Sequence, residues 1–219
     1  MRNLEKICKY SAIIHLDKGL SIMGNNNDIN IGGVDSEVIK NPITGEVYIP
    51  GSSIKGKIRS LLELKKGIQI KTDRKGNEYA DPCGCGDRDI CRIFGAHLNM
   101  KAKSAPTRII VRDASLTESS KEIIKNMPLD KGGYLEIKAE NSINRAKGTA
   151  NSPRFFERIP AGLEFNLEIL LQIFDDDNEE SLKSKLEEGL TLLQNNYLGG
   201  NGTRGYGKIS ILNGTWTEV

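Results

Sequence analysis

The segment from Leu163 to Ile173 constrains the fold of this 219-residue chain more than any other feature. Its apolar residues occupy every second position, which is the period of a strand with one buried and one solvated face. These residues are Leu163, Phe165, Leu167, Ile169, Leu171 and Ile173. The chain is therefore expected to contain a sheet with one apolar face.

One amphipathic helix is predicted before that strand in the sequence, and a second one after it. The first begins at Pro50-Gly51-Ser52-Ser53, where Ser52 or Ser53 is expected to cap it. The second is expected to be capped near Asp177. Each has apolar residues at helical spacing: Ile54, Ile58, Leu61 and Leu62 in the first, and Leu182, Leu186, Leu190 and Leu193 in the second.

Further strands are predicted at residues 7–16, 108–116, 134–140 and 208–212. Apart from long insertions, the order of elements is roughly β-α-β-β-α-β. This order predicts an α+β fold of the ferredoxin-like (RRM-type) class. The RRM aromatic signature is absent, so stacking of bases on the sheet is not indicated.

Charge is distributed unevenly although the net charge is only +2. Residues 55–75 are mostly basic, and residues 175–188 are mostly acidic. Opposite blocks of this kind steer a polyanion to one face, whereas the alternative interpretation is two ordinary solvated faces.

Two segments have patterns typical of phosphate binding. The start of the first predicted helix offers free backbone N–H groups, with Lys55, Lys57 and Arg59 close by. The run from Leu198 to Ile209 is rich in glycine and contains Arg204, so its backbone can approach a sugar–phosphate chain closely. The alternatives are a capped helix with solvated lysines and a flexible hairpin connection.

The glycine run LGGNGTRGYGKI, together with the earlier PGSSIKGKIRS helix, resembles the RAMP superfamily of CRISPR proteins. More specifically, the chain resembles the backbone subunit of type III-A (Csm-complex) effectors. Further matching stretches are IGGVDSEVIKNPITGEVYIPGSS, RIIVRDASL, IKAENSINRAKGTANSPRFFERIPAGLEF and LLQNNYLGGNGTRGYGKI. They follow one another in order over almost the whole chain.

The resemblance implies one RAMP domain over residues 1–219. It has a ferredoxin-like palm, a cysteine-bearing insertion at about 67–100, and a projecting thumb hairpin at about 140–160. The implied partners are a guide (CRISPR) RNA, a complementary target RNA, further copies of the chain and other Csm subunits. The expected RNA-binding residues are Ser52, Ser53, Lys55, Lys57, Arg59, Arg145, Arg154, Gly202, Arg204 and Gly205.

The resemblance also implies that Asp35 is required for cleavage of the target RNA. Its carboxylate is suited to hold Mg²⁺ or Mn²⁺ or to assist proton transfer, while the RNA 2′-hydroxyl acts as the nucleophile. Asp28 in the same loop is a rival, and an ordinary turn aspartate is the plain alternative. If Asp35 is inert, the chain is a non-catalytic RNA-binding scaffold.

Cys83, Cys85 and Cys91 lie within nine residues of one another, and His97 follows. Such a set predicts a structural zinc site, with His97 or Asp81 as the fourth ligand. Three reduced thiols without a metal are the alternative, and Cys8 is expected to be a buried apolar residue.

No stretch of the sequence has the roughly 20 apolar residues that span a bilayer, and the first residues lack the apolar region of a signal peptide. A cytoplasmic protein without membrane contact is therefore expected. The two histidines, His15 and His97, are not predicted to form an acid–base pair, so processing of the guide is not expected.

Overall fold

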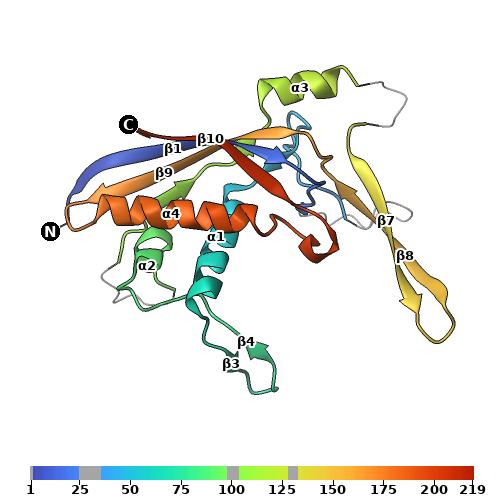
Figure 1. The fold of residues 1–219 in the computed structure, drawn as a ribbon, viewed down its shortest axis with the longest axis horizontal. Coiled ribbons are helices and arrows are strands. Elements are labelled where there is room, and N and C mark those ends of the chain that lie inside the picture. The colour runs from blue at the N-terminus through green and yellow to red at the C-terminus, as the bar shows by residue number, and fades with distance from the viewer. Residues whose placement is uncertain (1, 25–35, 98–103, 128–132) are drawn as a thin grey trace.

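The computed structural model describes residues 2–24, 36–97, 104–127 and 133–219. Its centre is an antiparallel sheet of four strands in the order β10-β1-β9-β5. The bounds are Leu4–Leu16 for β1, Ile109–Val111 for β5, Glu164–Phe174 for β9 and Ile209–Glu218 for β10. Helices α1 (Gly51–Lys66) and α4 (Glu179–Gln194) lie together on one side of the sheet (Figure 1).

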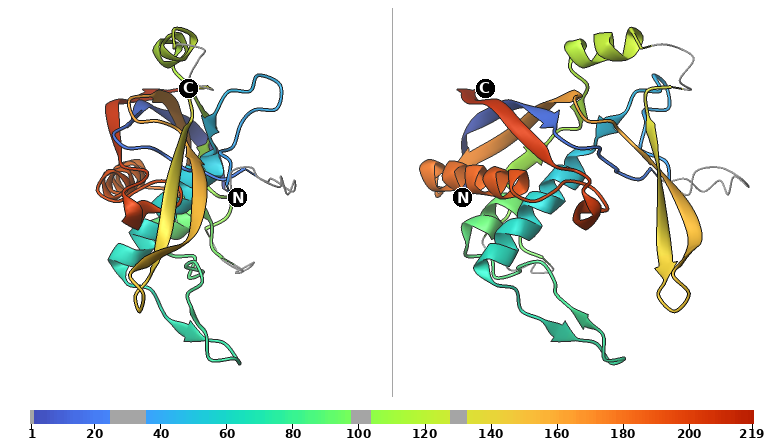
Figure 2. Two further views of the ribbon diagram at one scale, coloured as in Figure 1. Left: turned by 90° about the vertical axis from the view of Figure 1, so that its right-hand side faces the viewer. Right: turned by 45° about the vertical axis from the view of Figure 1, so that its right-hand side comes forward.

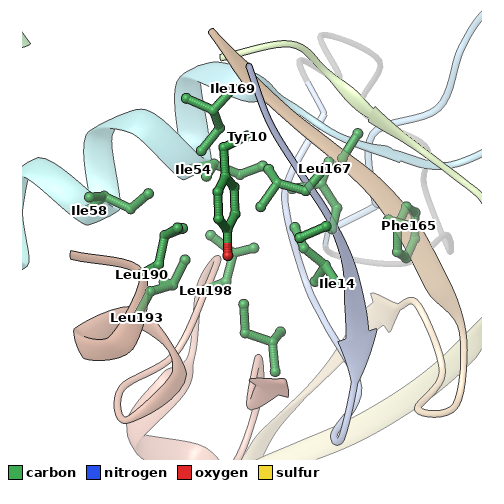
Figure 3. Packing of buried hydrophobic residues seen from close by; sticks show 14 of the residues in the cluster. Tyr10, Ile14, Ile54, Ile58, Phe165, Leu167, Ile169, Leu190, Leu193 and Leu198 are labelled. Atoms are coloured by element: carbon green, nitrogen blue, oxygen red, sulfur yellow. The ribbon is translucent and has the colours of Figure 1, made fainter. Parts of the chain in front are cut away.

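The core lies between this sheet and the two helices, as Figure 3 shows. The apolar alternation predicted for β9 is confirmed, because all of its inward residues are buried. The apolar stripes predicted for both helices are buried too. Gly189 lets the helices approach closely, since a Cβ there would lie 2.4 Å from Cγ2 of Ile58.

Several predicted elements differ from the structure. The single strand expected at 108–116 is two short strands in different sheets: β5, and β6 (Ala114–Ser115), which pairs with β2 (Tyr48–Ile49). The last strand continues to Glu218. Helices α2 (Asp89–Phe94) and α3 (Glu118–Lys125) were not predicted, because each is too short to show a clear apolar period.

The start of α1 differs from the prediction, whereas the cap predicted near Asp177 is confirmed within one residue. Helix α1 has Pro50 at its N-cap and no side-chain cap, so Ser52 and Ser53 lie inside its first turn. Helix α4 is capped one residue after Asp177, by Asn178, whose side chain accepts a hydrogen bond from the N–H of Ser181. Asp177 itself is fully buried and binds Arg108.

Two hairpins project from the body toward the same side (Figure 1, Figure 2). The larger consists of β7 (Glu136–Asn144) and β8 (Thr149–Arg158), and it carries the basic residues Arg145, Arg154 and Arg158. The smaller consists of β3 (Lys71–Thr72) and β4 (Glu78–Tyr79). None of the helices in the described ranges is long and apolar enough to cross a membrane.

Candidate nucleic-acid interface

The start of α1 is held against the connection between β5 and β6. The N–H of Gly51 donates a hydrogen bond to Oδ1 of Asp113 at 2.7 Å. A Cβ on Gly51 would lie 2.2 Å from the carbonyl oxygen of Val111, so glycine is required for this contact. A carboxylate of the protein therefore already occupies part of the anion site expected here, and phosphate contacts must rely more on the side chains of the helix.

Those side chains differ in how available they are for a contact with phosphate. Lys55 is half-buried, and burial together with the charge of Arg59 lowers its pKa. The ammonium of Lys57 lies 3.5 Å from the ring centroid of Tyr197. The guanidinium of Arg59 is already occupied by contacts within the protein. It pairs with Glu63 at 2.9 Å and donates hydrogen bonds to the carbonyl oxygens of Cys83 and Phe94.

The glycine-rich loop lies beside these residues. A Cβ on Gly202 would lie 1.9 Å from Cγ of Tyr197, so the loop packs directly on that ring. Gly207 has a φ of +68°, and a Cβ there would lie 1.9 Å from the carbonyl oxygen of Leu198. Gly205 has a φ of +85° but open space around it. The loop is therefore a tightly packed turn, built around the short 3₁₀ helix η2 (Gly202–Arg204).

An ionic cluster joins this loop to the base of the β7–β8 hairpin. Arg204 pairs with Glu140 at 2.9 Å, and Lys138 lies 3.6 Å from the other carboxylate oxygen. The ammonium of Lys138 and the guanidinium of Arg158 lie over the ring of Tyr206, at 4.3 and 5.1 Å from its centroid. Burial and the Glu140 carboxylate raise the pKa of Tyr206 to about 12, so its hydroxyl stays protonated near neutral pH.

The tip and outer strand of the β7–β8 hairpin carry cations that are not paired. Arg145 and Lys147 lie near the turn, and Arg154 lies on β8. All three are exposed, and none forms an ion pair with a described residue. Lys55, Lys57 and Lys66 on α1 also form no ion pair with a described residue, although only Lys66 is exposed. Of the predicted RNA-binding residues, the structure thus brings together those of α1 and the glycine loop, while Arg145 lies near the hairpin turn and Arg154 lies opposite Glu140 on β8.

More than half of the carboxylates in the acidic block at 175–188 form ion pairs within the protein. Asp176 pairs with Arg2, Glu179 with Lys6 and Lys183, and Glu188 with Lys65 and Lys185. The block therefore offers less free negative charge than the sequence indicated, whereas Asp175, Glu180 and Glu187 form no ion pair with a described residue.

Asp35 and Asp28 lie outside the described residues, so the structure gives no geometry for the expected cleavage site. The chain resumes at Ser36, which lies against β8. Its carbonyl oxygen accepts a hydrogen bond from the N–H of Glu157 at 2.9 Å, and the carboxylate of Glu157 accepts the N–H of Val38. The residue that follows Asp35 in the chain is therefore fixed to the base of the same hairpin.

The three cysteine sulfurs predicted to bind zinc do come together. Sγ of Cys85 lies 3.4 Å from that of Cys83 and 3.6 Å from that of Cys91. Sulfurs held at 2.3 Å from one tetrahedral metal lie about 3.8 Å apart, so this set fits zinc. Although burial works against it, backbone N–H groups near Asp87 and the two other thiols lower the pKa of Cys85 to about 7.

The imidazole of His97 is not part of this group, whose ligand atoms all lie within 4.8 Å of one another. His97 instead donates its backbone N–H to the carbonyl oxygen of Cys83. The alternative ligand Asp81 pairs with Lys71 at 2.8 Å. Cys8 is buried, as predicted, and His15 faces Glu164 at 3.4 Å on the sheet.

Sequence reasoning missed the residues that hold the interface together. Tyr197 and Tyr206 flank the glycine loop, and Glu140 links that loop to the hairpin. Two tyrosines bracketing a glycine run were a visible signal, because aromatic rings often support such turns. No sequence pattern singled out Glu140.

Comparisons with known proteins agree with this arrangement. A model of the RAMP superfamily matches residues 26–210. The protein named CRISPR system Cms endoribonuclease Csm3 from Methanocaldococcus jannaschii is 45% identical over 204 residues, which cover 91% of this chain and 76% of that protein. The protein of the same name from Streptococcus thermophilus is 39% identical over 210 residues, covering 93% and 86%.

Solved structures agree as well. A crystal structure of the Csm3-Csm4 subcomplex in the type III-A CRISPR-Cas interference complex matches with a TM-score of 0.60 and 31% identity. The match covers 99% of this chain and 81% of that one. A chain of the Type III-B Cmr-beta complex bound to cognate target RNA shares the fold, with a TM-score of 0.63 and 16% identity over 97% and 61%. The chain belongs to the RAMP superfamily and, within it, to the Csm3 family of CRISPR endoribonucleases.

Proposed function

We propose that this chain is the RNA-binding backbone subunit of a type III-A CRISPR interference complex and the endoribonuclease that cleaves the target RNA held there. The observation that carries the proposal is the meeting of α1, the glycine loop and the β7–β8 hairpin at one surface with unpaired cations. Relatives at up to 45% identity are named as endoribonucleases, which supports the activity.

The strand order β10-β1-β9-β5, with α1 and α4 on one side, supports a ferredoxin-like palm. The β7–β8 hairpin is the proposed thumb, corresponding to the expected insertion at about 140–160. Residues 67–100 form the cysteine-bearing insertion of a single RAMP domain. Further copies of the chain and other Csm subunits are the proposed protein partners, arranged along a guide RNA.

The guide RNA is proposed to lie across α1 and the glycine loop. Phosphates would contact Lys55, Lys57 and Arg204, with the hydroxyls of Ser52 and Ser53 at the helix start. Gly202 and Gly205 allow the strand to approach the loop, and Arg145 and Arg154 contact it along the hairpin. Contacts of this type position an RNA without reading its sequence, as a subunit that accepts many guides requires. Arg59 would act indirectly, by fixing α1 to the cysteine-bearing segment.

Cleavage is proposed to depend on Asp35. The 2′-oxygen attacks the adjacent phosphorus, and the bond from phosphorus to the 5′-oxygen breaks. The 2′-hydroxyl loses its proton and the departing 5′-oxygen gains one. The products are a 2′,3′-cyclic phosphate on the upstream fragment and a 5′-hydroxyl on the downstream fragment. A divalent cation held by Asp35, Mg²⁺ or Mn²⁺, would supply positive charge for the phosphate.

Cys83, Cys85 and Cys91 are proposed to hold a structural Zn²⁺, with the fourth position taken by His97, by Asp81 or by a water molecule. Each of the two side chains would first have to turn toward the sulfurs. Since Arg59 and Glu63 of α1 both bind the backbone of Cys83, the metal would stabilise the insertion against the helix. It would have no part in cleavage.

The decisive experiment compares Asp35→Ala with Asp28→Ala in the reconstituted complex, using a complementary RNA with Mg²⁺ and with EDTA. We expect Asp35→Ala to abolish cleavage without changing RNA affinity, and Asp28→Ala to cleave normally. If Asp35→Ala still cleaves in Mg²⁺, the chain is not the nuclease by this route and the scaffold alternative holds. If the affinity for RNA falls together with cleavage, Asp35 contributes to RNA binding.

A further inference from the structure

The β3–β4 hairpin and its flanking residues, from 67 to 82, form a projecting segment that we call the arm. Every residue from 64 to 82 is exposed, and the hairpin has only two cross-strand pairs. An isolated two-stranded hairpin is at best marginally stable in water. The arm points to the same side of the molecule as the β7–β8 hairpin (Figure 1, Figure 2). It is therefore suited to gain order from a partner that lies on this side.

The charge of the arm indicates the chemistry of that partner. Arg74 and Lys75 lie at its tip, and neither forms an ion pair with a described residue. Asp73, the carboxylate nearest to them in the chain, accepts hydrogen bonds from the N–H groups of Lys75 and Asn77 and from the Asn77 amide. It shapes the turn and leaves both cations pointing into solvent. At this tip an anionic partner would have two unpaired cations to contact.

The unpaired cations of the molecule are not scattered. Among the described residues, most of those with no carboxylate within 4 Å lie on α1, the cysteine-bearing insertion and the two hairpins. They are Lys55, Lys57, Lys66, Arg74, Lys75, Arg88, Arg145, Lys147 and Arg154. The cations of α4 are instead paired with carboxylates. Unpaired positive charge is thus concentrated on these elements, and the arm continues it along the chain beyond the end of α1.

We propose that the arm is a second contact for single-stranded RNA and binds the continuation of the strand that lies on α1. Arg74 and Lys75 contact phosphates. Tyr79, which is 46% exposed, offers its ring to a base. This inference rests on the RNA-binding function proposed above and extends it to a part of the chain that has no role there.

The geometry allows one strand to reach both places. From Lys55 to Lys66 the helix rises about 16 Å. The following residues up to Arg74 span at most about 26 Å in extended form. Between them, at the base of the arm, is a cleft of 390 Å³ lined partly by Lys66, Lys71 and Arg88. The path from α1 to the tip therefore passes Lys66 and Arg88, which form no ion pair with a described residue, and Lys71, which is paired with Asp81. The unpaired cations favour an anionic RNA over an apolar protein partner.

The test measures RNA affinity by fluorescence anisotropy for the purified chain, with Arg74→Ala/Lys75→Ala as the variant. Two unstructured RNAs are used: a short one of about 6 nucleotides, enough for one binding module, and a long one of about 24. Loss of two phosphate contacts lowers the slope of log affinity against log salt by about 1.4, which is about 25-fold at 0.1 M salt. We expect this loss for the long RNA and none for the short one.

The matched control is Lys9→Ala/Lys125→Ala, which removes the same charge from exposed or half-exposed positions on the outer face of the sheet and on α3. The affinity of this control variant for both RNAs should equal that of the wild type. Tyr79→Ala is a second variant, expected to weaken only the long RNA by about 5-fold or more. Because the arm contributes no buried residue, the unfolding midpoints of all variants should match the wild type.

Equal affinity of the arm variant and the control for the long RNA overturns the inference. So does a variant that keeps its RNA affinity but no longer assembles with other subunits, because the arm would then be a protein contact. If the wild-type chain, alone and in the complex, binds neither RNA, the proposed function itself falls. That result is distinct from a selective loss confined to the arm.

Discussion

Replacing Gly202 by alanine tests the packing that joins the glycine loop to α1. The added Cβ would lie 1.9, 2.1 and 2.2 Å from three carbons of the Tyr197 ring, whereas carbon atoms in contact are about 3.5–4.0 Å apart. The ring must therefore move by about 2 Å, away from the position in which it faces the ammonium of Lys57. Overpacking of this kind costs about 1–3 kcal/mol, and the lost cation–π contact about 0.5–1 kcal/mol more.

A double-mutant cycle isolates that clash. In a Tyr197→Ala background the ring is gone, so adding Gly202→Ala should change the free energy of unfolding by less than about 0.5 kcal/mol. The expected coupling between the two changes is about 1–3 kcal/mol. Urea unfolding of the wild type, both single variants and the double variant provides the four free energies.

Gly205→Ala is the matched control in the same loop. No atom lies within 4 Å of the position that its new Cβ would take, and its φ of +85° alone imposes a strain of about 1–2 kcal/mol. That cost should be the same with or without the Tyr197 ring. A coupling near zero for Gly202, or a coupling equally large for Gly205, would refute the packing described for the loop.

Further predictions concern the core and the cysteines. Asp177→Ala should lower the free energy of unfolding by about 3–5 kcal/mol, because it removes the closest carboxylate partner of the fully buried Arg108. Burial works to raise the pKa of Asp177, but hydrogen bonds from Arg108 and Arg92 outweigh it and lower that pKa. The stability from this carboxylate is therefore complete above about pH 4 and lost as pH falls through its lowered pKa, so the variant should show a smaller loss on acid titration followed by circular dichroism. Cys91→Ser should abolish the stoichiometric zinc measured by elemental analysis of the purified chain, while the buried Cys8→Ser should retain it; equal zinc in both would exclude the cysteine site.

The sequence predicted the elements that carry the core, because their signals are strong and local. The alternation over residues 163–173 and the stripes of both long helices each bury one continuous face, so periodicity alone located them. The ends of the helices were harder to predict from the sequence. Ser52 and Asn178 are both good capping residues in the sequence, but Pro50 and the contact of Gly51 with Asp113 set the start of α1. Such a contact joins residues far apart in the chain, and no local pattern records it.

The same limit applies to the candidate interface. Glycines 202 and 207 were recognised as a flexible, phosphate-accessible run, yet their tightest contacts are with Tyr197 and Leu198 of the protein itself. Arg59 looked like a phosphate ligand, but its partner Glu63 is one helical turn away and the carbonyl of Cys83 meets it only in the folded chain. Residue type thus predicted the kind of surface, whereas tertiary contacts decide which cations remain available.

That distinction explains how a chain of net charge +2 can present a basic surface. Affinity for a polyanion depends on cations that gain a phosphate without first losing a carboxylate. More than half of the acidic residues of α4 and of the segment before it are paired with neighbours such as Lys6, Lys185 and Arg108. Several cations of α1 and of both hairpins, among them Lys55, Arg74 and Arg145, form no ion pair with a described residue. The distribution of ion pairs, more than the total charge, therefore determines where RNA can bind, and removing unpaired arginines should weaken binding far more than removing paired ones.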